Sequence, residues 1–146
     1  MKNLNNKVVV ITGAGGYLCS EIARGFARAG CSVAMLDLRL EKSVEIEKEI
    51  NKEGFKKTLA LEINVSEKDQ HVNALETVIK EFGGCDILVN GAGINGPTPF
   101  MDITLDEWYS ILDSQLTGTM LGCQVFGGYM VSNQSGSIIN ISSASA

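Results

Sequence analysis

The sequence has little of what marks a membrane, secreted or nucleic-acid-binding protein. No stretch approaches the ~20 apolar residues that a membrane-spanning helix needs. Residues 1–13 hold only a four-residue apolar run, too short for the hydrophobic part of a signal peptide. Lysine and arginine total 12 against 17 aspartates and glutamates, and nothing clusters the basic residues into a phosphate-binding patch. We therefore expect a cytoplasmic chain that binds neither membrane nor nucleic acid.

Disulfide and metal-ligand patterns are also missing. The four cysteines stand alone, without CxxC pairs or histidine at metal-ligand spacing: Cys19, Cys31, Cys85 and Cys123. Isolated cysteines of this kind favour buried, reduced thiols over disulfides or a zinc site. The only histidine, His71, lies among charged and polar residues of a predicted helix. We expect it at the solvated surface and predict no metal site.

What the sequence does contain is a regular alternation of strand and helix patterns. Apolar, β-branched runs predict five strands, at residues 7–13, 32–37, 58–63, 86–90 and 137–142. Such continuous runs are typical of strands covered on both faces. Because helical patterns fill the intervals, the chain implies right-handed βαβ units and a parallel sheet. The predicted fold is α/β, a Rossmann-type doubly wound sheet in one dinucleotide-binding domain over residues 1–146.

Helix ends and apolar faces can be assigned from the same pass. The helix after the first strand carries Leu18, Ile22 and Phe26 at fourfold spacing and ends at Gly30. Ser66 with Asp69, and Thr104 with Glu107, form capping-box patterns that open two later helices. The first of these has one apolar stripe, made of Val72, Leu75, Ile79 and Phe82. The second is predicted to run from Thr104 toward Asn133 and is apolar on more than one face.

The turn after the first strand is a candidate phosphate-binding loop. It reads TGAGGYLC, residues 12–19, and opens a helix within a βαβ unit. Glycines at such a turn let the backbone approach a pyrophosphate, whose charge then lies against free N–H groups at the amino end of the helix. The alternative interpretation is that the segment is a tight turn that binds no ligand.

Asp37 strengthens the nucleotide-binding interpretation. It ends the second predicted strand, 24 residues after Gly13. That spacing is near the ~20 residues expected of an acid that accepts hydrogen bonds from the adenosine ribose hydroxyls. Because a carboxylate there repels a 2′-phosphate, Asp37 favours NAD over NADP. Arg39 tempers this preference, since a guanidinium two residues on could reach toward such a phosphate.

Three motifs in order resemble those of the short-chain dehydrogenase/reductase family. TGAGGYLC resembles the family's TGxxxGxG loop, NGAG at residues 90–93 resembles its NNAG motif, and GSIINISS resembles the strand that carries its catalytic serine. The resemblance runs along the whole chain. It implies an NAD(P)-dependent oxidoreductase that transfers a hydride between nicotinamide and an alcohol or carbonyl substrate. TGAGGYLC together with NGAGIN also resembles family members that act on sugars and sugar acids.

The resemblance implies roles for particular residues. Ser143 matches the serine that holds the substrate oxygen, and Gln115 stands where the family usually has a catalytic asparagine. Asn64, followed by Val65, takes the place of an acid that meets the adenine ring, with an amide oxygen that can still accept a hydrogen bond. Asn90 would brace the central strand. The implied cofactor-binding residues are Gly13, Gly15, Gly16, Tyr17, Leu18, Asp37, Asn64, Val65, Asn90, Gly91, Ala92 and Gly93.

Some of these positions depart from the family pattern. Tyr17 and Cys19 fall where the loop expects its second and third glycines, so Gly15 and Gly16 are expected to give the close approach and the helix to lie slightly farther from the sheet. Gln115 is one methylene longer than asparagine. We expect it to alter the helix kink and the water relay that the asparagine supports.

The family's proton donor, a tyrosine followed four residues later by lysine, has no match in the sequence. Tyr17, Tyr109 and Tyr129 lack lysine at that spacing, and the chain stops three residues after Ser143. We therefore expect a fold incomplete at its carboxyl side, with the last strand as an exposed sheet edge. Dehydrogenase, non-catalytic nucleotide-binding module, inactive fragment and half of a split enzyme stay open as alternatives. By family likeness, the helix over 104–133 is expected to support a homo-oligomer.

Overall fold

The structure is a computed structural model that describes residues 4–142. Its centre is one parallel five-stranded sheet in the order β3-β2-β1-β4-β5. The strands are β1 (Val8–Thr12), β2 (Ser32–Asp37), β3 (Thr58–Glu62), β4 (Ile87–Asn90) and β5 (Ser137–Asn140). The predicted α/β, Rossmann-type class is therefore confirmed.

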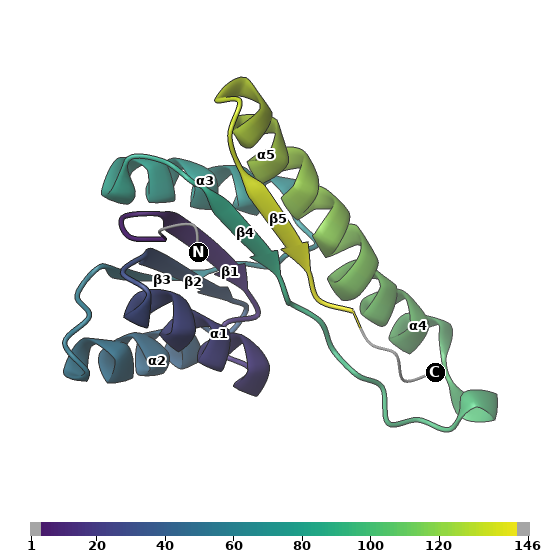
Figure 1. The fold of residues 1–146 in the computed structure, drawn as a ribbon. Coiled ribbons are helices and arrows are strands. Elements are labelled where there is room, and N and C mark those ends of the chain that lie inside the picture. The colour runs from purple at the N-terminus through teal and green to yellow at the C-terminus, as the bar shows by residue number, and fades with distance from the viewer. Residues whose placement is uncertain (1–3, 143–146) are drawn as a thin grey trace.

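Helices cover both faces of this sheet (Figure 1). The helices are α1 (Tyr17–Arg28), α2 (Leu40–Lys52), α3 (Lys68–Phe82), α4 (Leu105–Leu112) and α5 (Gly118–Ser132). A 3₁₀ turn lies at Phe100–Asp102, and a π-helical turn at Asp113–Thr117 joins α4 to α5. Helices α1 and α2 pack on one face, and α3 and α5 pack on the other.

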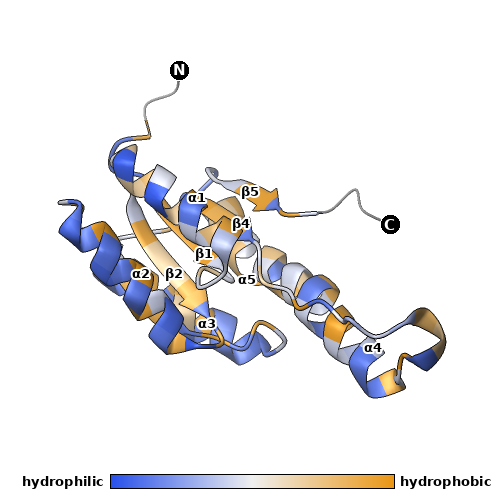
Figure 2. Ribbon diagram, turned by 90° about the horizontal axis from the view of Figure 1, so that it is seen from below, coloured by the Kyte–Doolittle hydropathy of each residue, from blue (hydrophilic) through white to orange (hydrophobic). Residues whose placement is uncertain are grey.

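The core consists of two apolar layers that share the sheet. Val9 and Ile11 of β1 face the α1 and α2 side, whereas Val8 and Val10 face α3 and α5. Because side chains alternate along a strand, a continuous β-branched run supplies apolar groups to both layers at once. The hydropathy colouring shows the same division, with apolar strands next to the largely polar outer faces of α2 and α3 (Figure 2).

The strand order determines where a ligand can bind. From β1 the chain builds outward through β2 and β3, and α3 then returns it to β4 on the other side of β1. The order therefore reverses between β1 and β4, and in open α/β sheets ligands bind beyond the carboxyl ends of the strands at this point. The loops that follow β1 and β4 meet there.

The prediction for α3 was wrong in its start and in part of its buried face. The helix begins at Lys68, with Glu67 as an N-cap residue that makes no side-chain hydrogen bond. The Ser66 N–H instead bonds to the side chain of Asn64. The buried residues are His71, Ala74 and Val78. Of the predicted stripe, Leu75 and Phe82 are partly buried against the core, and Val72 is exposed. The expectation that His71 lies at the surface is wrong as well, because its side chain is completely buried.

The apolar face of α1 also differs from its prediction. Leu18 is 56% exposed, and the helix buries small residues, Cys19, Ala23 and Ala27, against the sheet. Small side chains allow α1 to lie close to the strands, which is why the large residues of the stripe end up at its margin.

The carboxyl-side elements are more open than the rest of the molecule. Thr104 caps α4 as predicted, since its hydroxyl accepts the Glu107 N–H at 3.2 Å. β5 lies at the edge of the sheet, and Ile139 is 43% exposed. Within residues 4–142, none of the helices is both long and apolar enough to cross a membrane.

Candidate cofactor-binding site

The loops after β1 and β4 are in close contact at the point where the strand order reverses. Gly13 has φ +70°, a left-handed conformation that favours glycine, and a Cβ there would lie 2.7 Å from the Ala92 Cα. The Thr12 hydroxyl accepts the N–H groups of Gly91 and Ala92 at 3.1 and 3.2 Å. The first glycine of the loop and the residue before it therefore set the spacing of the two loops.

Asp37 is held at the end of β2 by the glycine loop. Its side chain is nearly buried, and its Oδ2 accepts the Gly15 N–H at 3.0 Å. A Cβ on Gly15 would lie 2.5 Å from the Lys42 Cβ and 3.0 Å from the Asp37 Oδ2. Only glycine fits between the two elements. Gly15 therefore orients Asp37 and does not itself line the neighbouring cleft.

Arg39 lies beside the same carboxylate. Its backbone N–H donates to the Asp37 Oδ1 at 3.0 Å, and its guanidinium Nε is 3.7 Å from that oxygen. The Arg39 side chain is 61% exposed. An exposed guanidinium can move away from Asp37, so the carboxylate is the better-fixed of the two charges.

A cleft of about 720 Å³ opens beside these residues, a volume typical of small-molecule sites. Ten of the twelve predicted cofactor-binding residues line it: Gly13, Gly16, Tyr17, Leu18, Asp37, Asn64, Val65, Gly91, Ala92 and Gly93. Asn90 does not. It is buried beneath the loop, where its Nδ2 donates to the Asn140 Oδ1 at 2.8 Å and links β4 to β5.

Sequence reasoning missed part of the lining: Cys19, Leu38, Ile63, Ile94, Asn95 and Ser114. Leu38 and Ile63 adjoin predicted residues at strand ends, so extending each motif by one residue would have found them. Ser114 lies in the π-helical turn, far along the chain from the rest, and no sequence signal points to it.

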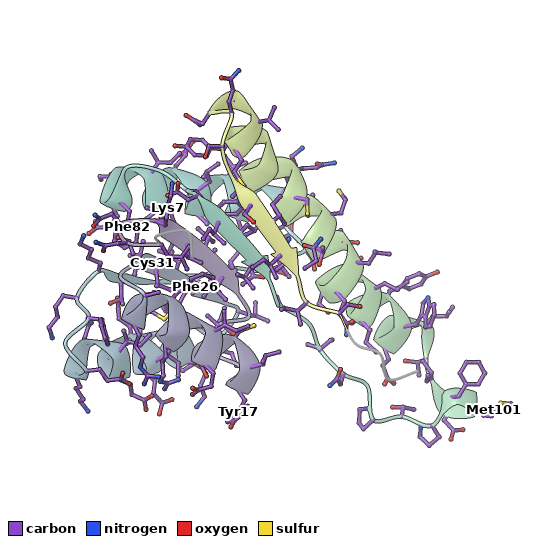
Figure 3. All side chains as sticks on the ribbon, viewed as in Figure 1. Lys7, Tyr17, Phe26, Cys31, Phe82 and Met101 are labelled. Carbon is purple, nitrogen blue, oxygen red and sulfur yellow. The ribbon has the colours of Figure 1, made fainter. Side chains whose placement is uncertain are left out.

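The departures from the glycine pattern are accommodated in two ways. Tyr17 begins α1 with its side chain 89% exposed and directed away from the protein, so its bulk does not fill the cleft (Figure 3). Cys19 is buried, and its Sγ occupies the space that a Cβ on Gly91 would need. The missing glycine in α1 is thus matched by a glycine in the facing loop. Burial and the nearby Asp37 charge raise the pKa of the Cys19 thiol, which stays protonated.

Asn64 and Val65 form the wall of the cleft opposite the glycine loop. The Asn64 Oδ1 accepts the Ser66 N–H at 3.1 Å. Because this bond uses the amide oxygen, it fixes which end of the side-chain amide faces the turn. A Cβ on Gly118 would lie 2.7 Å from the Val65 Cγ2, so the first residue of α5 packs directly on Val65.

A second cleft of about 690 Å³ lies across the loop 91–95 from the first and shares Gly91, Ala92, Gly93 and Asn95 with it. Gln115 lines this second cleft, and its Nε2 donates to the Ile94 carbonyl at 2.7 Å. The Thr119 hydroxyl donates to the Gln115 carbonyl at 2.6 Å. Ser142 also lines it, whereas Ser143 lies outside the described residues. Gln115 sits inside the π-helical turn that joins α4 to α5.

Metal ligands do not converge in this region. Between residues 4 and 142, no group of three or more histidine, cysteine, aspartate or glutamate side chains could hold a metal ion. The polar groups at the two clefts include backbone N–H groups, the Asp37 carboxylate, the Arg39 guanidinium, amides and hydroxyls. Such a set fits a nucleotide and a hydroxylated or carbonyl compound.

Comparison with known proteins places this geometry in a family. Residues 7–146 match the family model described as short chain dehydrogenase. An uncharacterized oxidoreductase of Haemophilus influenzae is 36% identical to the chain in sequence. The match covers 99% of this chain and 56% of that protein. A D-threitol dehydrogenase of Mycolicibacterium smegmatis is 33% identical over 98% of the chain, which covers 55% of that protein.

Solved structures agree with the sequence matches. A short-chain type dehydrogenase/reductase from Mycobacterium marinum superposes with a TM-score of 0.90 at 32% identity, covering 94% of this chain and 56% of that one. A putative D-mannonate oxidoreductase from Haemophilus influenza with bound NAD superposes with a TM-score of 0.88 at 36% identity. The match covers 96% of this chain and 56% of that one. The chain spans about half the length of the proteins it matches. By its motifs, its sheet order and these matches, the chain belongs to the short-chain dehydrogenase family.

Proposed function

We propose that the chain is the nucleotide-binding part of an NAD-dependent oxidoreductase that exchanges a hydride with an alcohol or carbonyl substrate. The observation that carries the proposal is the nearly buried Asp37 carboxylate, held by Gly15 at the rim of a cleft that also contains the amino end of α1. The pyrophosphate would lie against the N–H groups of Tyr17 and Leu18, the first residues of α1, where the helix dipole favours negative charge. When bound, NAD supplies the hydride-accepting or hydride-donating carbon.

NAD rather than NADP is the proposed cofactor because the fixed charge at the ribose end is negative. Asp37 can accept hydrogen bonds from the ribose hydroxyls, whereas a 2′-phosphate would face a carboxylate with little access to screening water. Arg39 is the competing feature, but its guanidinium is mostly exposed. The bound NAD in a structural relative supports nicotinamide cofactors in general.

The second cleft is the proposed place of the substrate and the nicotinamide. Gln115, the loop 91–95 and Ser142 surround it, and Ser143 follows directly in the sequence as the proposed holder of the substrate oxygen. We propose a sugar or sugar acid as substrate, since relatives include a D-threitol dehydrogenase and a putative D-mannonate oxidoreductase. The amide and hydroxyl groups of this cleft suit a polyhydroxylated compound.

Turnover is proposed to need a proton donor that the 146 residues do not contain, since none of Tyr17, Tyr109 and Tyr129 has a lysine four residues later. General acid and base catalysis typically contributes about 10²- to 10⁴-fold. The chain should therefore bind NADH and catalyse hydride transfer at most slowly.

Titration with NADH followed by turnover assays separates the possibilities. Binding without turnover on a panel of alcohols, sugars and sugar acids is the expected result, and it fits either a nucleotide-binding module or part of an enzyme. Robust turnover by the 146-residue chain would show that the acid has been misassigned. Absence of NADH binding would refute the nucleotide site itself. Reading the DNA beyond codon 146 for a Tyr-x-x-x-Lys pair distinguishes a partial enzyme from a module.

We also propose that the chain self-associates through the helical segment 105–132, which comprises α4, the π-helical turn and α5. Large apolar side chains are exposed along it, including Leu105 at 70%, Leu116 at 66% and Val131 at 78%. Exposed apolar side chains mark interaction sites where they gather into a patch. Sedimentation should show a dimer or larger species that Leu116→Glu dissociates; a monomer at all concentrations would contradict the proposal.

A further inference from the structure

Gln70 and His71 are consecutive residues of α3. Both side chains hydrogen-bond to the backbone of the turn at Asn64 and Val65. The Gln70 Oε1 accepts the Asn64 N–H at 2.6 Å. The His71 Nε2 lies 2.8 Å from the Val65 carbonyl oxygen. One side chain thus bonds to the N–H group of the first residue and the other to the carbonyl of the second, so the backbone of the turn is fixed at both ends.

The His71 contact requires a defined protonation state. A carbonyl oxygen can only accept, so the Nε2 must carry the proton. Burial lowers the pKa of His71, and the bond to Val65 opposes this shift. The ring is therefore a neutral donor. Its Nδ1 has no hydrogen-bond partner among the described residues, and its ring packs edge-on to Phe126 at 6.2 Å.

An apolar residue would suit this position better if packing were its only task. The site is completely buried, and an unpaired ring nitrogen there is costly. What histidine adds over leucine is the single bond to the Val65 carbonyl. Val65, the residue to which it bonds, lines the first cleft and is packed by Gly118.

We propose that His71 and Gln70 are positioning residues that make the Asn64 side chain selective for adenine, an inference that rests on the proposed nucleotide function. The Asn64 Oδ1 is already bonded to the Ser66 N–H, so its amide cannot turn over to suit another base. Adenine presents a donor at N6 and an acceptor at N1, and hypoxanthine presents the reverse. An amide held in one orientation distinguishes them, whereas an amide on a loosened turn adapts to either.

The test measures Kd for NADH and for reduced nicotinamide hypoxanthine dinucleotide with the 146-residue chain and three variants. His71→Leu keeps the packing and removes the donor, while His71→Gln places an amide nitrogen near the position of Nε2. Glu76→Ala, an exposed change in the same helix, is the matched control. We expect His71→Leu to weaken NADH binding by roughly three- to tenfold, the worth of one hydrogen bond, and to weaken hypoxanthine binding less. His71→Gln should restore most of the preference.

The outcomes separate the two levels of the account. Equal weakening of both dinucleotides, or no rescue by glutamine, would mean that His71 only fills space and would overturn the inference. Failure of the unaltered chain to bind either dinucleotide would instead overturn the proposed function. Should His71→Leu fail to fold, Gln70→Ala on the exposed side of α3 gives the same test, with a smaller loss of base preference expected and an unchanged preference contradicting the proposal.

Discussion

Asp37 joins the strand β2 to the glycine loop, and each of its oxygens has a backbone partner. The Gly15 N–H occupies Oδ2 and the Arg39 N–H occupies Oδ1, so the carboxylate is oriented before any ligand binds. Preorganisation of this kind lowers the cost of ordering a site on binding. A single residue therefore determines both the shape of the ribose end and its charge.

Replacement of Asp37 should alter cofactor preference rather than binding in general. We expect Asp37→Ala to weaken NADH by about ten- to a hundredfold, because hydrogen bonds to a charged group are worth about 1.5 to 3 kcal/mol. NADPH should change little, since the same substitution removes repulsion from its phosphate. Fluorescence titration of both cofactors checks this, with Glu41→Ala, an exposed acid in α2, as the charge-matched control. Equal weakening of NADH and NADPH would remove Asp37 from the ribose.

At the scale of elements, α1 and the loop after β4 depend on each other through one contact. The Cys19 thiol fills the volume beside Gly91, so neither position is free to change alone. The pair shows that a departure from a glycine motif on one element can be balanced by a small residue on its neighbour.

A double-mutant cycle in urea tests this dependence. Gly91→Ala should lower the free energy of unfolding by about 1 to 3 kcal/mol through overpacking against the Cys19 sulfur. In a Cys19→Ala background the same change should cost less, giving a coupling of about 0.5 to 3 kcal/mol. Full recovery is not expected, since the added Cβ also lies 3.2 Å from the Thr12 carbonyl oxygen. Strictly additive effects would show that the two elements are not in contact.

The same scale explains which features could be predicted from the sequence. Strands such as Val8–Thr12 are continuous apolar runs ended by glycine or polar residues, and their pattern is local, so all five were found. The face of α3 was misassigned in part because it is set by packing against α5, an element that lies far along the chain. His71 is polar by composition and buried by that tertiary contact. Ser114 joins the cleft only because a π-helical turn brings it there, and no local pattern encodes that turn.

At the scale of the whole molecule, stability should depend on pH through the buried histidine. The pKa of His71 is lowered from 6.5 by burial, so below that pH the unfolded chain binds a proton that the folded chain refuses. The free energy of unfolding should therefore fall as the pH drops below 6.5, at up to about 1.4 kcal/mol per pH unit. His71→Leu should flatten urea-unfolding stability between pH 6.5 and 5. An unchanged slope would show that the ring is accessible to protons in the folded state.

The central claim is that the glycine loop at residues 13–16 and the carboxylate of Asp37 together hold the adenosine half of a dinucleotide. The most direct measurement is a crystal structure of the chain with NAD bound. The account predicts ribose hydroxyls hydrogen-bonded to Asp37, the pyrophosphate at the amino end of α1, and adenine beside Asn64. A dinucleotide seated elsewhere, or a ribose turned away from Asp37, would contradict it.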